Sequence, residues 1–166
     1  MRLALLAFAL ILIGSPSTAQ PARITSVYTS LDLDRCKSVD REELASAWWR
    51  CKGFAGIPIF VQNDDDRYDV DAGREDNDEL WSDTFDYPGK SVEWRIARGK
   101  PFAIIYRLDS ANPDAPKWSR LLVETIGRKS PGCRVASING RARDANAQAR
   151  RVADRILSGA VRCQNR

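Results

Sequence analysis

The chain contains no histidine among its 166 residues. This absence excludes imidazole as a catalytic base, as a metal ligand and as a pH sensor near neutrality. The sequence also lacks a glycine-rich phosphate-binding loop and a dinucleotide-binding fingerprint. A serine nucleophile would need a lysine as its base, and no serine can be assigned to one from the sequence. We therefore predict no catalytic residues, no cofactor and no metal.

No charge of one sign dominates the composition. Lys and Arg number 26 against 22 Asp and Glu, which gives a net charge of +4. That balance, spread over a whole domain, is too small to indicate nucleic-acid binding. With 43% apolar and 29% charged residues, the chain is too hydrophobic for wholesale disorder. Its length is that of one domain with a sizeable core.

Long hydrophobic runs are absent except at the start of the chain, where residues 3–13 are all apolar. Small residues, Ser17 and Ala19, then stand three and one positions before Gln20. This order is typical of a secretory signal peptide, which we assign to residues 1–19. Eleven helical residues span only about 16 Å of a ~30 Å hydrocarbon core. An N-terminal membrane anchor is the alternative; otherwise the protein is periplasmic or secreted.

Four cysteines follow the predicted cut, and no two of them form a Cys-x-x-Cys pair. The spacing excludes a thioredoxin-like redox motif and disfavours a metal site. An even number of cysteines in an exported chain predicts disulfides, which can pair in three ways. We favour Cys36–Cys51 and Cys133–Cys163, because each pair lies within one end of the chain and short loops close at a lower entropic cost.

The second half of the chain predicts an antiparallel meander. Between Ser91 and Ala97, apolar and charged residues alternate, which is typical of a half-buried strand with Trp94 facing the core. Glu93 and Arg95 would face the opposite way. Three further strands are predicted at Phe102 to Leu108, Trp118 to Ile126 and Cys133 to Ile138.

A C-terminal helix follows the meander, from a cap at Asp144 to about Leu157, with Gly159 suited to its end. Six apolar side chains would share its buried face: Ala149, Val152, Ala153, Ile156, Leu157 and Ala160. The sequence thus predicts an α+β fold, in which residues 20–166 form one domain and the helix packs on an antiparallel sheet.

The first half of the chain is less clearly patterned. Gly56 to Gln62 favours a strand, and Pro58 predicts that this strand lies at a sheet edge or begins at the proline. Asp40 to Trp48 fits two interpretations. It can begin a helical turn with a capping box, or it can be a loop that leads into a strand from Ala47 to Cys51. The sequence leaves both open.

An acidic stretch from Asn63 to Glu79 holds nine carboxylates and is interpreted as a surface loop, with a strand at Tyr68 and Val70 as an open alternative inside it. Its charges repel one another, so it needs solvation or a positive partner. We predict the binding residues to be Asp64, Asp65, Asp66, Asp69, Asp71 and Trp81. Three alternatives remain: a plain solvated loop, a weak cation site whose spacing does not match an EF-hand, and a counter-charge for the arginine-rich C-terminal helix.

Two segments, Tyr28 to Cys36 and Trp49 to Val61, resemble the corresponding parts of an uncharacterised family of small exported proteins from proteobacteria. The resemblance covers most of the chain after the predicted cut. It implies secretion and a paired first disulfide. It implies no activity and no catalytic residues.

These observations predict an exported binding or accessory module of the cell envelope rather than an enzyme, with an envelope protein or a glycan as its partner and with no nucleic acid. One alternative is a carboxylate-based glycan hydrolase, since two acids suffice for that chemistry and the five tryptophans can stack on sugars. The other is a glycan-binding or cation-binding module. The oligomeric state is not encoded in any pattern that we identify.

Overall fold

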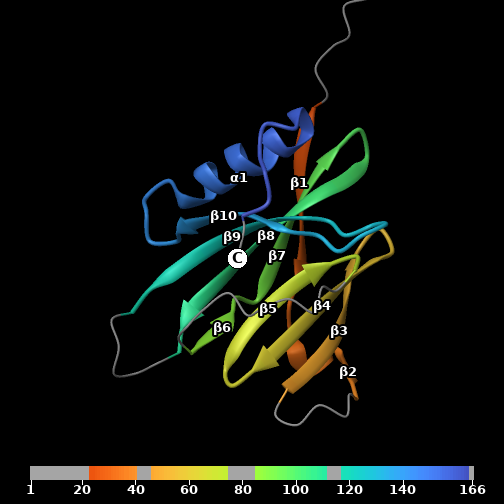
Figure 1. Cartoon of the computed structure of the whole chain (residues 1–166), viewed down its shortest axis with the longest axis vertical. Helices are drawn as coiled ribbons and strands as arrows, with labels where there is room; N and C mark the ends of the chain where they lie inside the picture. Colours follow the sequence, from red (N-terminus) through yellow and green to blue (C-terminus); the bar gives the residue numbers. More distant parts are fainter. Residues whose placement is uncertain (1–22, 41–45, 75–84, 112–116, 165–166) are drawn as a thin grey trace, which may run out of the picture.

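The computed structural model describes residues 23–40, 46–74, 85–111 and 117–164. The predicted signal peptide, its cleavage site and Trp81 lie outside these ranges. Within them, the chain forms a six-stranded sheet, a four-stranded sheet and one α-helix. The large sheet is the middle layer, with the helix on one face and the small sheet on the other (Figure 1). The predicted α+β class with a C-terminal helix is confirmed.

The large sheet is antiparallel, in the order β1-β7-β8-β9-β10, with the short β6 also paired to β8. Its strands are β1 (Ile24–Ser30), β6 (Asp86–Pro88), β7 (Ser91–Ala97), β8 (Lys100–Ser110), β9 (Ser119–Thr125) and β10 (Arg134–Asn139). The order β7-β8-β9-β10 is the predicted meander. β1 adds itself to β7, placing Val27 opposite Trp94.

The small sheet holds β2 (Lys37–Val39), β3 (Ser46–Phe54), β4 (Ile57–Asp64) and β5 (Arg67–Ala72), in that order. A single 3-10 turn, η1 (Leu33–Arg35), connects β1 to it. Trp48 is therefore part of a strand, as in the second of the two interpretations of this segment. Of the two predictions for β4, the edge position was wrong, because β4 lies between β3 and β5, whereas the start at the proline is correct to within one residue. Pro58 is tolerated one residue into β4, where the pairing with β3 is irregular.

Three of the hairpins turn through pairs of residues that both have positive φ. That backbone geometry is the type I′ turn, whose twist matches the twist of antiparallel strands. The pairs and their φ angles are Ala55 (51°) with Gly56 (78°), Asp65 (52°) with Asp66 (57°), and Arg98 (50°) with Gly99 (73°). The turns fix which side chains stand at each hairpin tip.

The core between the two sheets is centred on Trp94, which is fully buried with Val92, Ile104 and Tyr106 around it. The predicted orientation of Trp94 is confirmed, and its indole Nε1 donates a 2.8 Å hydrogen bond to Thr29. The prediction that β7 is only half-buried was wrong. Glu93 and Arg95 do face the other way, but the helix covers that face of the sheet as well.

The helix α1 (Ala145–Arg155) continues as the 3-10 turn η2 (Ile156–Ser158) and ends at Gly159, whose φ is 67°. Its buried face is alanine-rich: Ala145, Ala149 and Ala153 are all buried against the large sheet. Leu157 was predicted on this face but lies half-exposed, because the change from α to 3-10 geometry rotates it outward.

Both predicted disulfides are confirmed, with S–S distances of 2.05 Å for Cys36–Cys51 and 2.02 Å for Cys133–Cys163. The first joins the segment after η1 to β3, and the second ties the end of the chain to the loop before β10. In the described ranges, no helix is long and apolar enough to cross a membrane.

Candidate binding site beside the first disulfide

The acidic stretch begins as a β-hairpin rather than as a loop. Asp64 ends β4, Asp65 and Asp66 form the turn, and Asp69 and Asp71 lie on β5. At the tip, the side chain of Asp65 is 74% exposed, and Arg67 lies 3.9 Å from its carboxylate and 4.0 Å from that of Asp64. Exposed carboxylate is thus concentrated at the turn.

The expectation that Asp69 and Asp71 belong to a solvated loop was wrong, because both are buried. Asp69 instead receives a 2.7 Å hydrogen bond from Arg134 of β10, in the other sheet. Burial of a carboxylate is tolerated here because a cation compensates for its lost hydration. Any binding role of these two residues stays a prediction, as does that of Trp81.

Asp69 belongs to a buried charge cluster that also contains Tyr106, Glu124 and Arg134. The Arg134 guanidinium lies 2.7 Å from Asp69 and 3.0 Å from Glu124. The Tyr106 hydroxyl lies 2.8 Å from Glu124 and 3.1 Å from Asp69, so its one proton serves one carboxylate at a time. The cluster thereby joins the small sheet to three strands of the large one.

Within this buried charge cluster, two carboxylates share one guanidinium. Burial and the nearby charge of Asp69 raise the pKa of Glu124 to about 8, which Arg134 only partly offsets. Burial and the two carboxylates also raise the pKa of Tyr106 well above its usual value. A shared proton between two acids is suited to acid–base chemistry, but all four side chains are only 1–3% exposed. In this structure the buried charge cluster offers no surface to a glycan, and its evident role is to connect the sheets.

A second polar network lies between the large sheet and α1. Glu93 accepts hydrogen bonds from Ser26, from Tyr28 at 3.0 Å and from Arg150 at 2.7 Å. Burial raises the pKa of Glu93, but the donated hydrogen bonds outweigh it, so its pKa lies below the usual value. Beside it, Arg95 donates to both carboxylate oxygens of Asp154. This network fixes α1 on the sheet.

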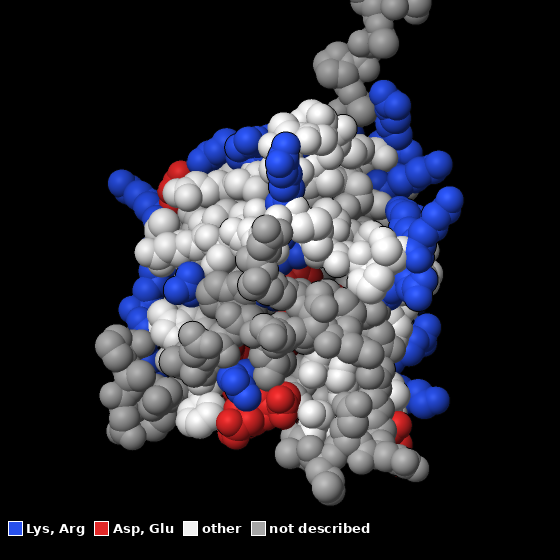
Figure 2. All heavy atoms as spheres, viewed as in Figure 1, with Lys and Arg blue, Asp and Glu red and all other residues white. Residues whose placement is uncertain are grey.

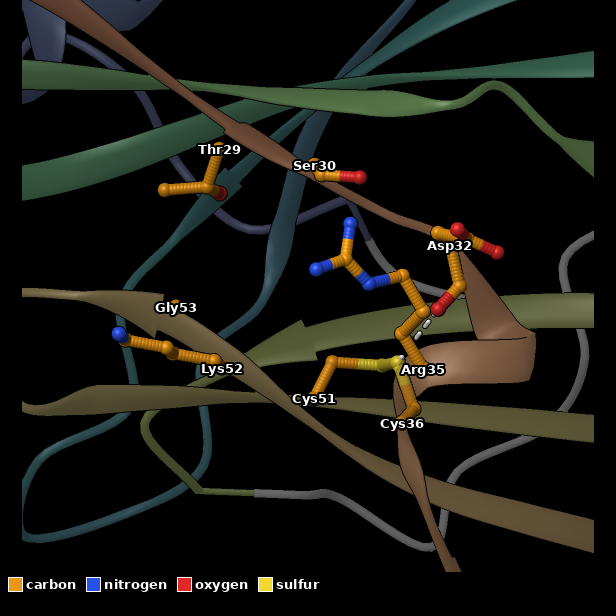
Figure 3. A pocket seen from close by; sticks show the side chains of 8 residues that line it. All are labelled: Thr29, Ser30, Asp32, Arg35, Cys36, Cys51, Lys52 and Gly53. Atoms are coloured by element: carbon orange, nitrogen blue, oxygen red, sulfur yellow. Dashed lines mark hydrogen bonds between the residues drawn. A yellow bond between two sulfur atoms is a disulfide. The ribbon is translucent and has the colours of Figure 1, made fainter.

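A pocket of about 350 Å³ opens next to the Cys36–Cys51 disulfide (Figure 3). Its walls come from the end of β1, from η1 and from the middle of β3. Its lining residues are Thr29, Ser30, Asp32, Arg35, Cys36, Cys51, Lys52 and Gly53. A volume of this size accommodates a small ligand or one group of a larger one.

The Arg35 guanidinium extends into the space between β1 and β3, and Lys52 extends along the opposite side of the pocket (Figure 3). Within the part of the chain that the structure describes, neither cation makes a hydrogen bond or ion pair through its side chain. The carboxylate of Asp32 points away from the guanidinium. The pocket therefore presents two cationic donors together with the hydroxyls of Thr29 and Ser30.

The disulfide and a glycine set the shape of this pocket. Because Cys36 and Cys51 are bonded, with their Cα atoms 4.4 Å apart, the neighbouring Arg35 and Lys52 are brought to one place. A Cβ on Gly53 would stand 2.1 Å from the Ile57 carbonyl oxygen and 2.8 Å from the Trp94 ring. Only glycine therefore fits, and it lets β3 approach Trp94 closely while leaving the pocket open.

The charge exposed by the described residues is far from the balance of the whole chain. Five of the fourteen described carboxylates are buried, but only two of the twenty-three described cations. Figure 2 shows many lysine and arginine atoms at the edges of the molecule, one group of acidic atoms near its lower end and a smaller one at the upper left. Among the described residues, cations that are not buried therefore outnumber carboxylates that are not buried by twenty-one to nine.

Sequence reasoning missed Arg35 and Lys52 as binding residues, although the predicted disulfide contained the signal, since residues next to bonded cysteines must lie close together. Among the described residues, no group of three or more cysteine or acidic side chains could hold a metal ion. No protein-family model, curated protein or solved structure matches the chain.

Proposed function

We propose that the protein is an exported binding module of the cell envelope that captures an anionic group in the pocket beside Cys36–Cys51. The observation that supports this best is the pair of cations, Arg35 and Lys52, which stand at one small pocket and make no ion pair within the described residues. The one carboxylate that lines the pocket, that of Asp32, points away from the Arg35 guanidinium. Cations without a partner lose little by binding a carboxylate or phosphate, because they need not break an existing ion pair.

The hydroxyl groups define what the pocket would recognise beyond charge. Thr29 already accepts the hydrogen bond of the Trp94 indole, so its own proton is left to donate. With Ser30 beside it, the pocket offers neutral donors next to the cations. That combination suits an acidic sugar or a peptide carboxylate, both of which carry oxygen acceptors around the charge.

The expected location rests on two independent features. The N-terminal segment has the order of a signal peptide, and two disulfides are consistent with an oxidising compartment. A cell envelope contains acidic glycans and peptides with free carboxylates, so a ligand of the proposed class is available there.

The pocket is tested by NMR titration of the oxidised protein with glucuronate and, separately, with inorganic phosphate. We expect the backbone resonances of Ser30, Lys52 and Gly53 to shift with at least one probe. The double variant Arg35→Gln and Lys52→Gln should abolish these shifts. The matched control is Lys37→Gln with Lys90→Gln, which removes the same charge at positions outside the pocket. Equal loss in both variants, or no shifts in the unmodified protein, would refute the proposal.

The tip of the β4–β5 hairpin remains a second candidate surface, for a basic protein partner. Its Asp65 and Asp66 are exposed at a tight turn, and a loop held by a rigid hairpin is a usual place for recognition. Charge there would steer a basic partner and make capture sensitive to salt.

A further inference from the structure

A groove of about 680 Å³ lies at the end of the molecule opposite the proposed pocket. It lies between the turn of the β7–β8 hairpin, the loop after β9 and the turn η2. Its lining combines three cations with apolar side chains: Ala97, Arg98, Lys100, Pro101, Phe102, Arg128 and Leu157. We call these seven residues the basic groove. It lies at the end of β1 where Ile24 pairs with Ala97, whereas the proposed pocket lies at the other end of β1.

No carboxylate among the described residues lines the basic groove, and three more exposed cations flank it in the sequence or across the sheet. Lys129 follows Arg128, Arg155 precedes η2, and Arg23 precedes the residue that pairs with Ala97. None of the six cations forms an ion pair within the described residues, although Arg128 and Arg155 donate to backbone carbonyls. In Figure 2, blue spheres line the upper right edge, where Figure 1 places this hairpin.

The apolar part of the basic groove is exposed where a helix surface would normally be polar. Leu157 is 49% exposed, and Phe102 beside it is only partly buried. A purely polyanionic partner, such as an acidic polysaccharide, would contact the cations but would offer no apolar group to the leucine and phenylalanine between them. At a bilayer surface, in contrast, cations meet phosphates while a leucine reaches the start of the acyl chains.

We propose that the basic groove docks the protein on a bilayer surface that contains anionic phospholipid, and that it holds one phosphate headgroup between Arg98, Lys100 and Arg128. Leu157 and Phe102 would contact the adjoining acyl region. This inference is independent of the proposed pocket, which remains open to its ligand at the other end of β1. Docking would therefore orient that pocket away from the membrane.

The expected strength follows from the number of cations. Each lysine or arginine near an anionic surface raises membrane partitioning about fivefold at physiological salt, and the attraction falls off within a Debye length. Removal of two charges should therefore lower partitioning by ~25-fold, and their reversal by more. A single leucine adds a smaller contribution that does not depend on salt.

The test is co-sedimentation of the oxidised protein with vesicles of phosphatidylglycerol and phosphatidylcholine in equal parts, and with vesicles of phosphatidylcholine alone. We expect binding to the mixed vesicles only. The variant Arg98→Glu with Lys100→Glu should reduce it by ~25-fold or more. The variant Lys37→Glu with Lys90→Glu, which changes the net charge equally at positions outside the groove, should bind nearly as the unmodified protein does. Leu157→Ser should weaken the binding that remains at high salt.

Three outcomes would overturn the proposal. The first is no binding of the unmodified protein to the mixed vesicles. The second is equal loss in the two charge-reversal variants, which would indicate attraction by net charge alone. The third is an NMR shift of Arg98 and Lys100 with inorganic phosphate but no vesicle binding, which would make the groove a site for a free anion. Arg35→Gln with Lys52→Gln should leave vesicle binding intact, so failure of either proposal can be recognised separately.

Discussion

Glu93 and Glu124 lie on opposite faces of the large sheet, and their pKa values shift in opposite directions. Both are buried. Glu93 is surrounded by donors, so hydrogen bonds from Arg150, Ser26 and Tyr28 outweigh the effect of burial and favour its charged form. Glu124 shares the Arg134 cation with Asp69, so burial and repulsion between the two carboxylates raise the pKa of Glu124. Burial raises the pKa of both carboxyls; the donors around Glu93 outweigh it, whereas the second carboxylate beside Glu124 adds to it.

The two networks also differ in their access to water. The buried charge cluster around Glu124 is closed, whereas the network around Glu93 reaches the surface through Arg150, whose side chain is 39% exposed. If a mutation removes a hydrogen bond to Glu93, water can therefore replace part of it. Water cannot do the same beside Glu124.

The largest effect is expected for Arg134→Met. It would leave Asp69 and Glu124 buried together without a cation, which typically costs ~3–5 kcal/mol of unfolding free energy. Arg150→Met is the matched variant in the open network and should cost ~1 kcal/mol or less. Urea unfolding followed by tryptophan fluorescence measures both. Similar losses in the two variants would contradict the distinction between closed and open networks.

Trp94→Ala tests the apolar core beside the buried charge cluster. Trp94 is fully buried, so its truncation should cost ~3–5 kcal/mol. Ile105→Val, which removes one methylene on the helix side of the same sheet, should cost ~0.5–1.5 kcal/mol. Thermal unfolding would report both changes. A loss below ~1 kcal/mol for Trp94→Ala would mean that this side chain is not part of a packed core.

The opposite pKa shifts predict opposite pH dependences. The pKa of Glu124 rises from 4.5 to about 8 on folding, so its contribution to stability is complete below pH 4.5 and is lost as the pH rises through about 8. Glu124→Gln should therefore flatten the decline in unfolding free energy between these values. The pKa of Glu93 falls on folding, so its contribution is present above its unfolded pKa of 4.5 and is lost in acid.

Unfolding curves at pH 5, 7 and 8.5 separate the two carboxylates. We expect Glu124→Gln to gain stability relative to the unmodified protein as the pH rises, and Glu93→Gln to lose stability at every one of these values. A parallel response of the two variants would show that Glu124 is ionised in the folded protein at neutral pH.

The smallest effect is expected at the hairpin tip. Replacement of Asp64, Asp65 and Asp66 by asparagine should change the unfolding free energy by no more than ~0.5 kcal/mol, because the tip is exposed and asparagine tolerates positive φ. If the tip recognises a basic partner, capture at low salt should weaken. Early melting with intact capture would instead assign the tip a structural role as a counter-charge.

The parts of the fold that could be predicted from the sequence are those with local signals. Alternation in Ser91 to Ala97 gave the faces of β7, and the positions of the cysteines gave both disulfides. The burial of Glu93 and Arg95 could not be predicted, because their partners Arg150 and Asp154 are 57 and 59 residues further along the chain.

The buried charge cluster was harder to predict for the same reason. Asp69 alternates with Val70 as it would in any strand with one polar face, and nothing nearby in the sequence points to Arg134, 65 residues away. A high density of charge in the sequence predicts exposure. In this protein, cations supplied from distant strands made burial of part of that charge possible.

The pairing of β1 with β7 has a consequence for the order of folding. The tight hairpins of the small sheet close within short stretches of chain, and Cys36 with Cys51 can be oxidised once these strands meet. β1 can pair only after β7 has been synthesised, because Val27 lies opposite Trp94, which follows it by 67 residues in the chain. Contacts this distant are slow to form, so the large sheet should be completed last, around a small sheet that is already cross-linked.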